Sequence, residues 1–148
     1  MRLEKEYYQD LVLNDTILGE DQVLVGISHA KSHVRLPLTH GQKFGFLSRL
    51  YATSSKSPGS VLALSGLFCF GFAGVAGDPM VTLTRTSNLE IRNTLLDCPV
   101  IHFPTGIVEK IGDSSMVVVA YGINDCHSRF VEIEKRIIAK HLFSSLPK

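Results

Sequence analysis

The chain has 148 residues, of which 45% are hydrophobic and 20% charged, and its formal net charge is +1. This composition is typical of a single globular domain that is long enough to bury a core. The 15 basic and 14 acidic residues form no basic tract, so we expect no nucleic-acid binding.

The N-terminus and the longest apolar stretch bear on membrane targeting. The N-terminal sequence MRLEKEYYQD is charged from its second residue and lacks the apolar core of a secretory signal. The stretch 62–77 is rich in glycine and shorter than the roughly 20 residues that cross a bilayer, so it predicts buried strands. We therefore predict no signal peptide and no membrane span, and the compartment stays open.

The three cysteines, Cys69, Cys98 and Cys126, are widely spaced and form no C-x-x-C pair. A zinc site built on cysteines is therefore not expected, and no cofactor fingerprint is present. Three reduced thiols are the favoured interpretation, because disulfide frameworks are usually dense in cysteine. One disulfide with a free thiol is the alternative.

Short runs of β-branched and aromatic residues, separated by turn signals, predict a mostly β fold. The predicted strands are 21–28, 43–53, 60–72 with a break at Gly66, 80–84, 100–111 with an interruption at 104–106, 115–122 and 128–134. Turn signals lie at 54–60, 77–79 and 112–115, and the long stretch 28–42 reads as irregular.

The two ends of the chain read as helical. The segment 2–13 predicts a helical turn or two. The segment 135–143 predicts a short C-terminal helix, because Ile137, Ile138 and Leu142 recur at helical spacing. Strands at such regular intervals fit a sandwich, a barrel or a propeller.

The strand 128–134 alternates, with Phe130 and Glu132 on one face and Val131 and Ile133 on the other. Glu132 and Glu134 share a face and could mimic the carboxylate pair of a glycosidase. An outward polar face explains them better.

Several segments resemble, in order, the last blades of a carbohydrate enzyme family with a five-bladed β-propeller. These segments are VLVGISHAKS, KFGFLSRLYAT, SGLFCFGF and IHFPTGIVEKIGDSSMVVVAYGINDC. They are similar to the mannoside-phosphorylase-like glycosidases and to propeller modules associated with glycosyltransferases. The resemblance implies an all-β fold of about two four-stranded antiparallel blades. It divides one domain, 1–148, into an N-terminal segment 1–20, blades 21–134 and a C-terminal helix and tail 135–148.

In that family, strand ends near the propeller axis deliver polar side chains to a sugar pocket. The resemblance therefore implies that His29, Arg49, Tyr121 and Asp125 bind substrate, with Asp125 accepting hydrogen bonds from sugar hydroxyls. Two blades do not close a five-bladed ring, and the family's general acid lies in blades that this sequence lacks. The catalytic residues thus stay unassigned, and the chain resembles the C-terminal part of such a protein.

Other interpretations of the same residues stay open. Asn124 and Asp125 also suit a turn, because their side chains bond nearby backbone groups. Lys31 and Arg35, with Arg49, could bind an anion, although solvated loop charges are favoured. Cys126 and His127 are adjacent on a strand and so point to opposite faces, which argues against a thiol–imidazole pair.

The resemblance therefore implies a protein that binds or processes a hexose glycan of the mannose type, by glycosyl transfer, hydrolysis or phosphorolysis. The expected partner is a sugar, together with the remaining propeller blades. The alternative is a non-catalytic β module that binds a protein partner or its own copy through open sheet edges.

Overall fold

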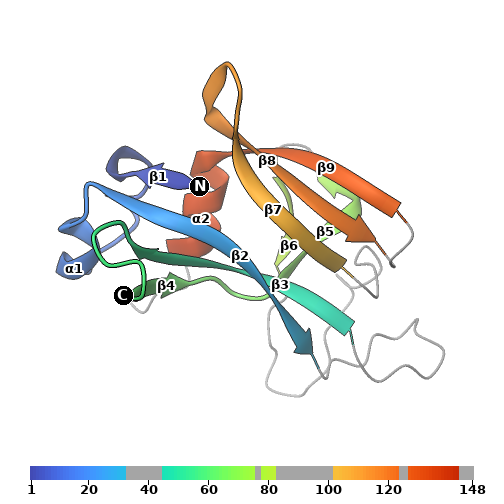
Figure 1. Cartoon of the computed structure of the whole chain (residues 1–148), viewed down its shortest axis with the longest axis horizontal. Helices are drawn as coiled ribbons and strands as arrows, with labels where there is room; N and C mark the ends of the chain where they lie inside the picture. The colour runs from blue at the N-terminus through green and yellow to red at the C-terminus, as the bar shows by residue number, and fades with distance from the viewer. Residues whose placement is uncertain (33–44, 76–77, 83–101, 124–126, 144–148) are drawn as a thin grey trace.

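A computed structural model describes residues 1–32, 45–75, 78–82, 102–123 and 127–143 and shows two antiparallel β-sheets with one short helix between them (Figure 1). Strands make up 59% of this part of the chain, which confirms the predicted all-β class. In chain order the elements are β1 (Arg2–Glu4), η1 (Lys5–Tyr7), α1 (Asp15–Leu18), β2 (Gln22–Ser32), β3 (Gly45–Ser54), β4 (Val61–Leu64), β5 (Phe68–Val75), β6 (Asp78–Thr82), β7 (His102–Lys110), β8 (Asp113–Ile123), β9 (His127–Glu134) and α2 (Lys135–Phe143).

The two sheets differ in size. The larger sheet has six strands in the order β1-β2-β3-β5-β6, with β4 also paired to β3. The smaller sheet has three strands in the order β7-β8-β9. Blades of four strands each, as the resemblance implies, stay a prediction.

Most strands lie where the sequence predicts them. The break at Gly66 separates β4 from β5, and the segment 104–106 is a register shift within β7. The β7–β8 hairpin turns at Ile111 and Gly112, where Gly112 has φ +83°, a left-handed conformation that suits glycine. The predicted irregular stretch 28–42 was wrong at its start, because residues up to Ser32 continue β2 and pair with β3.

The N-terminal segment was predicted correctly only in part. Residues 5–7 form one helical turn, η1, but residues 2–4 form β1, which pairs antiparallel with β2. Leu3 is fully buried by this pairing. The helices that follow, η1 and α1, are short, and Asn14 caps α1 by accepting a hydrogen bond from the Thr16 backbone N–H at 2.9 Å.

The core lies between the sheets and α2. The helix contacts β3 and β4 of the larger sheet and β8 and β9 of the smaller one. Its apolar side, including Ile138, Leu142 and Phe143, is fully or almost fully buried, and the Phe143 ring lies 5.1 Å from the Tyr8 ring. The predicted C-terminal helix at 135–143 is thus confirmed, and it holds the two sheets together.

A buried lysine joins three distant elements at the start of α2. Lys135 is 1% exposed, and its Nζ lies 2.9 Å from Glu4 Oε2 of β1 and 3.3 Å from Glu109 Oε1 of β7. The ammonium also lies 5.6 Å from the ring centre of Tyr7. Burial opposes the charge, but the hydrogen bonds to both carboxylates outweigh it and raise the pKa of Lys135.

Candidate functional site

The two predicted sugar-binding residues of the larger sheet lie on opposite faces. In the β2–β3 register His29 pairs with Ser48, and Ser28 pairs with Arg49. Successive residues of a strand point to opposite sides, so the side chains of His29 and Arg49 point away from each other. The Arg49 Nε is buried and has no hydrogen-bond partner among the described residues.

Tyr121 lies in the core. It is 9% exposed, and its ring lies 4.9 Å from the ring of Phe70 on β5. Burial raises the pKa of its hydroxyl, although the nearby Arg129 guanidinium acts in the opposite direction. Tyr121 therefore connects the two sheets by aromatic packing.

The other predicted site residues fall largely outside the described part of the chain. Asp125 and Arg35 lie outside it, and so does the side chain of Lys31, whose backbone pairs with Phe46. His29 and Arg49 point to opposite faces and Asp125 lies outside the described residues, so the four-residue sugar pocket as a whole stays a prediction.

His29 meets an aromatic residue that the sequence reasoning did not identify. Its ring centre lies 3.9 Å from that of Phe103 on β7, at a tilt of 31°. Both rings reach the surface, and Phe103 is 39% exposed. Phe103 pairs with Gly122, and a Cβ atom on Gly122 would meet only the Phe103 carbonyl oxygen, at 3.9 Å. We call His29, Phe103 and Gly122 the aromatic corner.

The aromatic corner lies at one end of a wider surface, the side of the β7-β8-β9 sheet that faces away from the core. We call this surface the outer face. Its residues follow from the register: Phe103, Gly122 and Ser128 form one row, Gly106, Ala120 and Phe130 the next, and Val108, Val118 and Glu132 a third. The opposite side of the same strands is buried, with Val117, Val119 and Ile133 at or near zero exposure.

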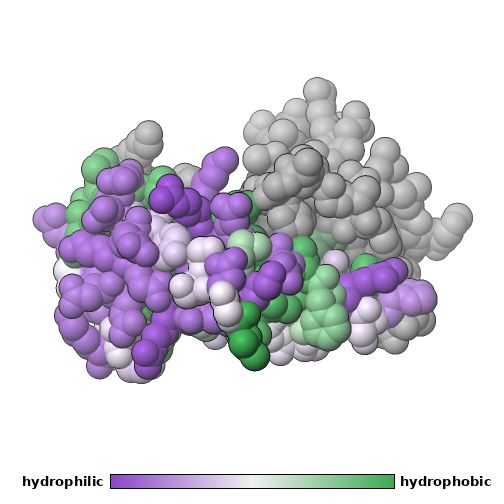
Figure 2. All heavy atoms as spheres, turned by 90° about the horizontal axis from the view of Figure 1, so that it is seen from above, coloured by the Kyte–Doolittle hydropathy of each residue, from purple (hydrophilic) through white to green (hydrophobic). Residues whose placement is uncertain are grey.

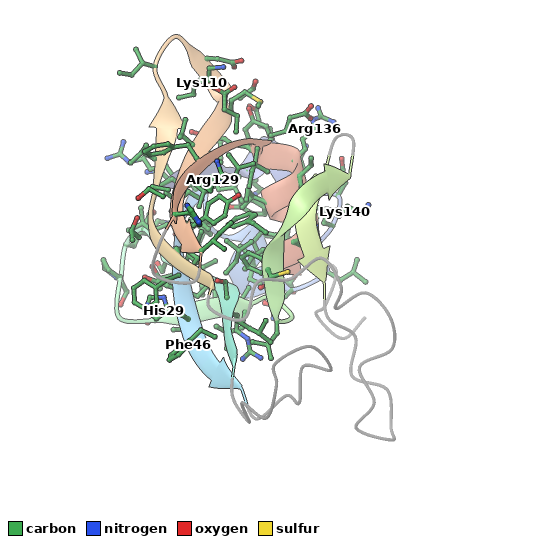
Figure 3. The ribbon with its side chains drawn as sticks, turned by 90° about the vertical axis from the view of Figure 1, so that its right-hand side faces the viewer. His29, Phe46, Lys110, Arg129, Arg136 and Lys140 are labelled. Carbon is green, nitrogen blue, oxygen red and sulfur yellow. The ribbon has the colours of Figure 1, made fainter. Side chains whose placement is uncertain are left out.

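Charged side chains mark the other end of the outer face. Lys110 donates a hydrogen bond to Glu132 Oε2 at 2.6 Å, which raises the pKa of Lys110. Figure 3 shows Lys110 near the tip of the β7–β8 hairpin and His29 at the end of the molecule away from that tip. The outer face therefore runs from an aromatic end to a charged end.

Three further features are metal ligands, membrane-spanning helices and cysteines. Within the described ranges, no group of three or more potential metal ligands gathers, and no helix is both long and apolar enough to cross a membrane. Cys69 forms a disulfide, so the favoured interpretation of three reduced thiols was wrong and the alternative with one disulfide holds. Cys98 and Cys126 lie outside the described residues.

Comparison with protein-family models, with curated proteins and with solved structures finds no match for this chain. Its function must therefore be argued from the geometry of its own surfaces.

Proposed function

We propose that the chain is a carbohydrate-binding β module and that a hexose glycan of the mannose type binds at the aromatic corner. The observation that supports this proposal is the partly exposed stack of His29 on Phe103, beside the open position at Gly122. An aromatic ring offers an apolar face to the C–H side of a sugar ring, while an imidazole can bond its hydroxyls.

The position of Gly122 adds to this support. Because its Cβ position is open, a sugar ring that covers Phe103 can extend over β8 without meeting a side chain there. Thr105, two residues after Phe103, is exposed, and its hydroxyl donates to the Ala120 carbonyl at 3.2 Å, so its oxygen can still accept a hydrogen bond.

In this proposal the chain contributes binding rather than bond cleavage. Glu132 and Glu134, the carboxylates that share a face of β9, lie near the opposite end of the outer face. The row of Gly122 and the row of Glu132 are four positions apart along β8, which is about 13 Å at the usual rise of a strand. A glycosidase places its two carboxyl groups on either side of the bond that it cleaves.

The relation to propeller carbohydrate enzymes belongs to the same proposal. A propeller would need further blades, and any glycosyl transfer, hydrolysis or phosphorolysis would need an acid from them. In that setting the aromatic corner would hold one part of the glycan while another segment performs the chemistry.

Calorimetric titration with manno-oligosaccharides tests the proposal. We expect Phe103→Ala to weaken binding by about tenfold, equivalent to a loss of about 1.4 kcal/mol. Gly122→Val should weaken it similarly by filling the space beside Phe103. Asp125→Ala tests the residue that the resemblance implies.

Phe130→Ala is the matched control, because Phe130 lies on the same sheet in the next row and on the far strand. It should bind like wild type. If the wild-type chain binds no sugar, or if Phe103→Ala and Phe130→Ala bind as well as wild type, the proposal is wrong.

A further inference from the structure

The outer face exposes two large apolar side chains on neighbouring rows. Phe130 on β9 is 73% exposed and Val108 on β7 is 60% exposed. Val118 and Ala120 of β8 lie between them and are partly exposed. Figure 2 looks onto the molecule from the side of the β7–β8 hairpin and shows hydrophobic atoms between hydrophilic ones. Contiguous exposed apolar surface often marks an interaction site.

We propose that two copies of this chain associate through the outer face, about a two-fold axis that runs along β8. Such an axis places β9 of one copy over β7 of the other, and the rows of Gly106 and Val108 over the same rows of the second copy. Because the sheets twist, the contact is closest over these two rows and the hairpin, and the row of Phe103 lies outside it. The face must then be complementary to itself across β8, both in shape and in charge.

The shape is complementary in the row of Gly106, Ala120 and Phe130. On the β9 side this row has a large exposed ring, and on the β7 side it has no side chain at all. A Cβ atom built on Gly106 would meet nothing within 4 Å. Rotation about β8 places Phe130 of each copy over the open position at Gly106 of the other, while Ala120 lies over Ala120.

The charge is complementary at the hairpin end. Lys110 lies on the β7 side, while Glu132 and Glu134 lie on the β9 side. The same rotation brings Lys110 of each copy opposite the two carboxylates of the other. In the single chain Lys110 already bonds Glu132 at 2.6 Å, so its ammonium lies on this face. The net charge of +1 adds little repulsion between copies.

A second copy fits this surface better than an unrelated occupant, because the face itself contains both the ring and the space that receives it. A lipid surface or an extended apolar peptide would cover Phe130 and Val108 but would make no use of the open position at Gly106. The exposed ring of Phe130 and the open position at Gly106 are therefore the two features to test.

Sedimentation velocity across a concentration series, with the full chain, is the primary experiment. Wild type should reach a dimer. Phe130→Ala removes the ring and Gly106→Val fills its place, and each should raise the dimer dissociation constant at least tenfold. Gly106 has no positive φ, so valine is compatible with the strand there. Circular dichroism and thermal melting check that both variants are folded.

Ile111→Ser is the matched control. Ile111 is 99% exposed at the tip of the same hairpin, outside the paired rows. Its replacement should leave the dimer unchanged, whereas general hydrophobic clustering would be reduced as much by Ile111→Ser as by Phe130→Ala.

A charge exchange tests the orientation of the two copies. Lys110→Glu and Glu132→Lys should each weaken the dimer, and the two together in one chain should restore most of it, since this ion pair then only exchanges strands. Three results would overturn the proposal: a wild-type monomer at every concentration, a dimer that tolerates Gly106→Val, or a dimer that Ile111→Ser dissociates equally. Phe130→Ala should lose the dimer but bind manno-oligosaccharides like wild type. Measuring its sugar binding separately therefore distinguishes failure of this proposal from failure of the glycan proposal.

Discussion

The ring of Tyr51 lies across Gly26 of the neighbouring strand, and a Cβ atom built on Gly26 would lie only 2.3 Å from Tyr51 Cζ. The two residues are partners in the β2–β3 register. A glycine at this position thus lets an aromatic side chain lie flat on the sheet, where it covers the backbone of β2.

Gly26→Ala should force the Tyr51 ring away from β2. We expect a loss of about 1–3 kcal/mol in the free energy of unfolding, the usual range for overpacking. Urea denaturation of the variant and wild type measures it. In the background of Tyr51→Ala the same substitution should be nearly neutral, because no ring is left to displace. Additive effects of the two substitutions would contradict this account.

Lys135→Met should destabilise the fold although it preserves most of the side chain's volume. The variant loses the hydrogen bonds to Glu4 and Glu109, and bonds that involve charged groups contribute about 1.5–3 kcal/mol. Arg136→Met is the control, because Arg136 is the next residue and is exposed, and its replacement should change stability by no more than about 0.5 kcal/mol. Equal effects of the two substitutions in denaturation would show that the buried ion pairs contribute nothing.

Tyr8 should make the fold sensitive to alkaline pH. Burial, with the nearby carboxylates of Glu20 and Asp21, raises the pKa of Tyr8 to about 12. The unfolded chain releases this proton near pH 10, so above that pH the unfolded state binds fewer protons than the folded state. The stability from Tyr8 is therefore complete below about pH 10 and declines as the pH rises towards 12.

Tyr8→Phe tests this dependence. The variant lacks the hydrogen bond from the Tyr8 hydroxyl to the Glu20 carbonyl, 2.8 Å long, and should be less stable at neutral pH. Its stability should fall less steeply than that of wild type between pH 10 and 12. Parallel curves for the two proteins would assign the alkaline loss to other groups.

Tyr121→Ala distinguishes a core residue from a sugar-binding one. Truncating a buried aromatic side chain usually costs about 3–5 kcal/mol, and Tyr121 packs against Phe70 between the sheets. Phe130→Ala, an exposed aromatic of the same sheet, should cost less than about 1 kcal/mol in the unfolding of the isolated chain. A fully stable Tyr121→Ala protein that had lost sugar binding would instead favour the implied pocket.

The sequence predicts the strands well because their signals are local. Alternation in 128–134 places Phe130 and Glu132 on one face and Ile133 on the other, and the structure confirms this arrangement, with Phe130 exposed and Ile133 buried. Gly66 and Gly112 separate strands as expected. By contrast, β1 is strand only because it pairs with β2, some 20 residues later, and its own residues favour a helix.

The surface features were harder to predict because they depend on register. Whether His29 and Arg49 share a face is decided by the pairing of β2 with β3, and a shift of one residue would reverse it. Phe103 and Phe130 were not singled out as site residues. Each is an apolar residue on a strand face that also contains glycine or glutamate, and such a mixed face can be exposed. The sequence alone does not tell which face of the strand the core covers.

The contact between Lys135 and Glu4 also constrains the order of folding. The two residues are 131 positions apart, so during synthesis the Glu4 carboxylate remains without its ammonium until α2 has left the ribosome. The β7–β8 hairpin can form from its own residues alone, whereas α2 must close the longest loop of the described fold. We therefore expect docking of α2 to be the late step of folding, and nascent chains that stop before Lys135 to retain an open, aggregation-prone core.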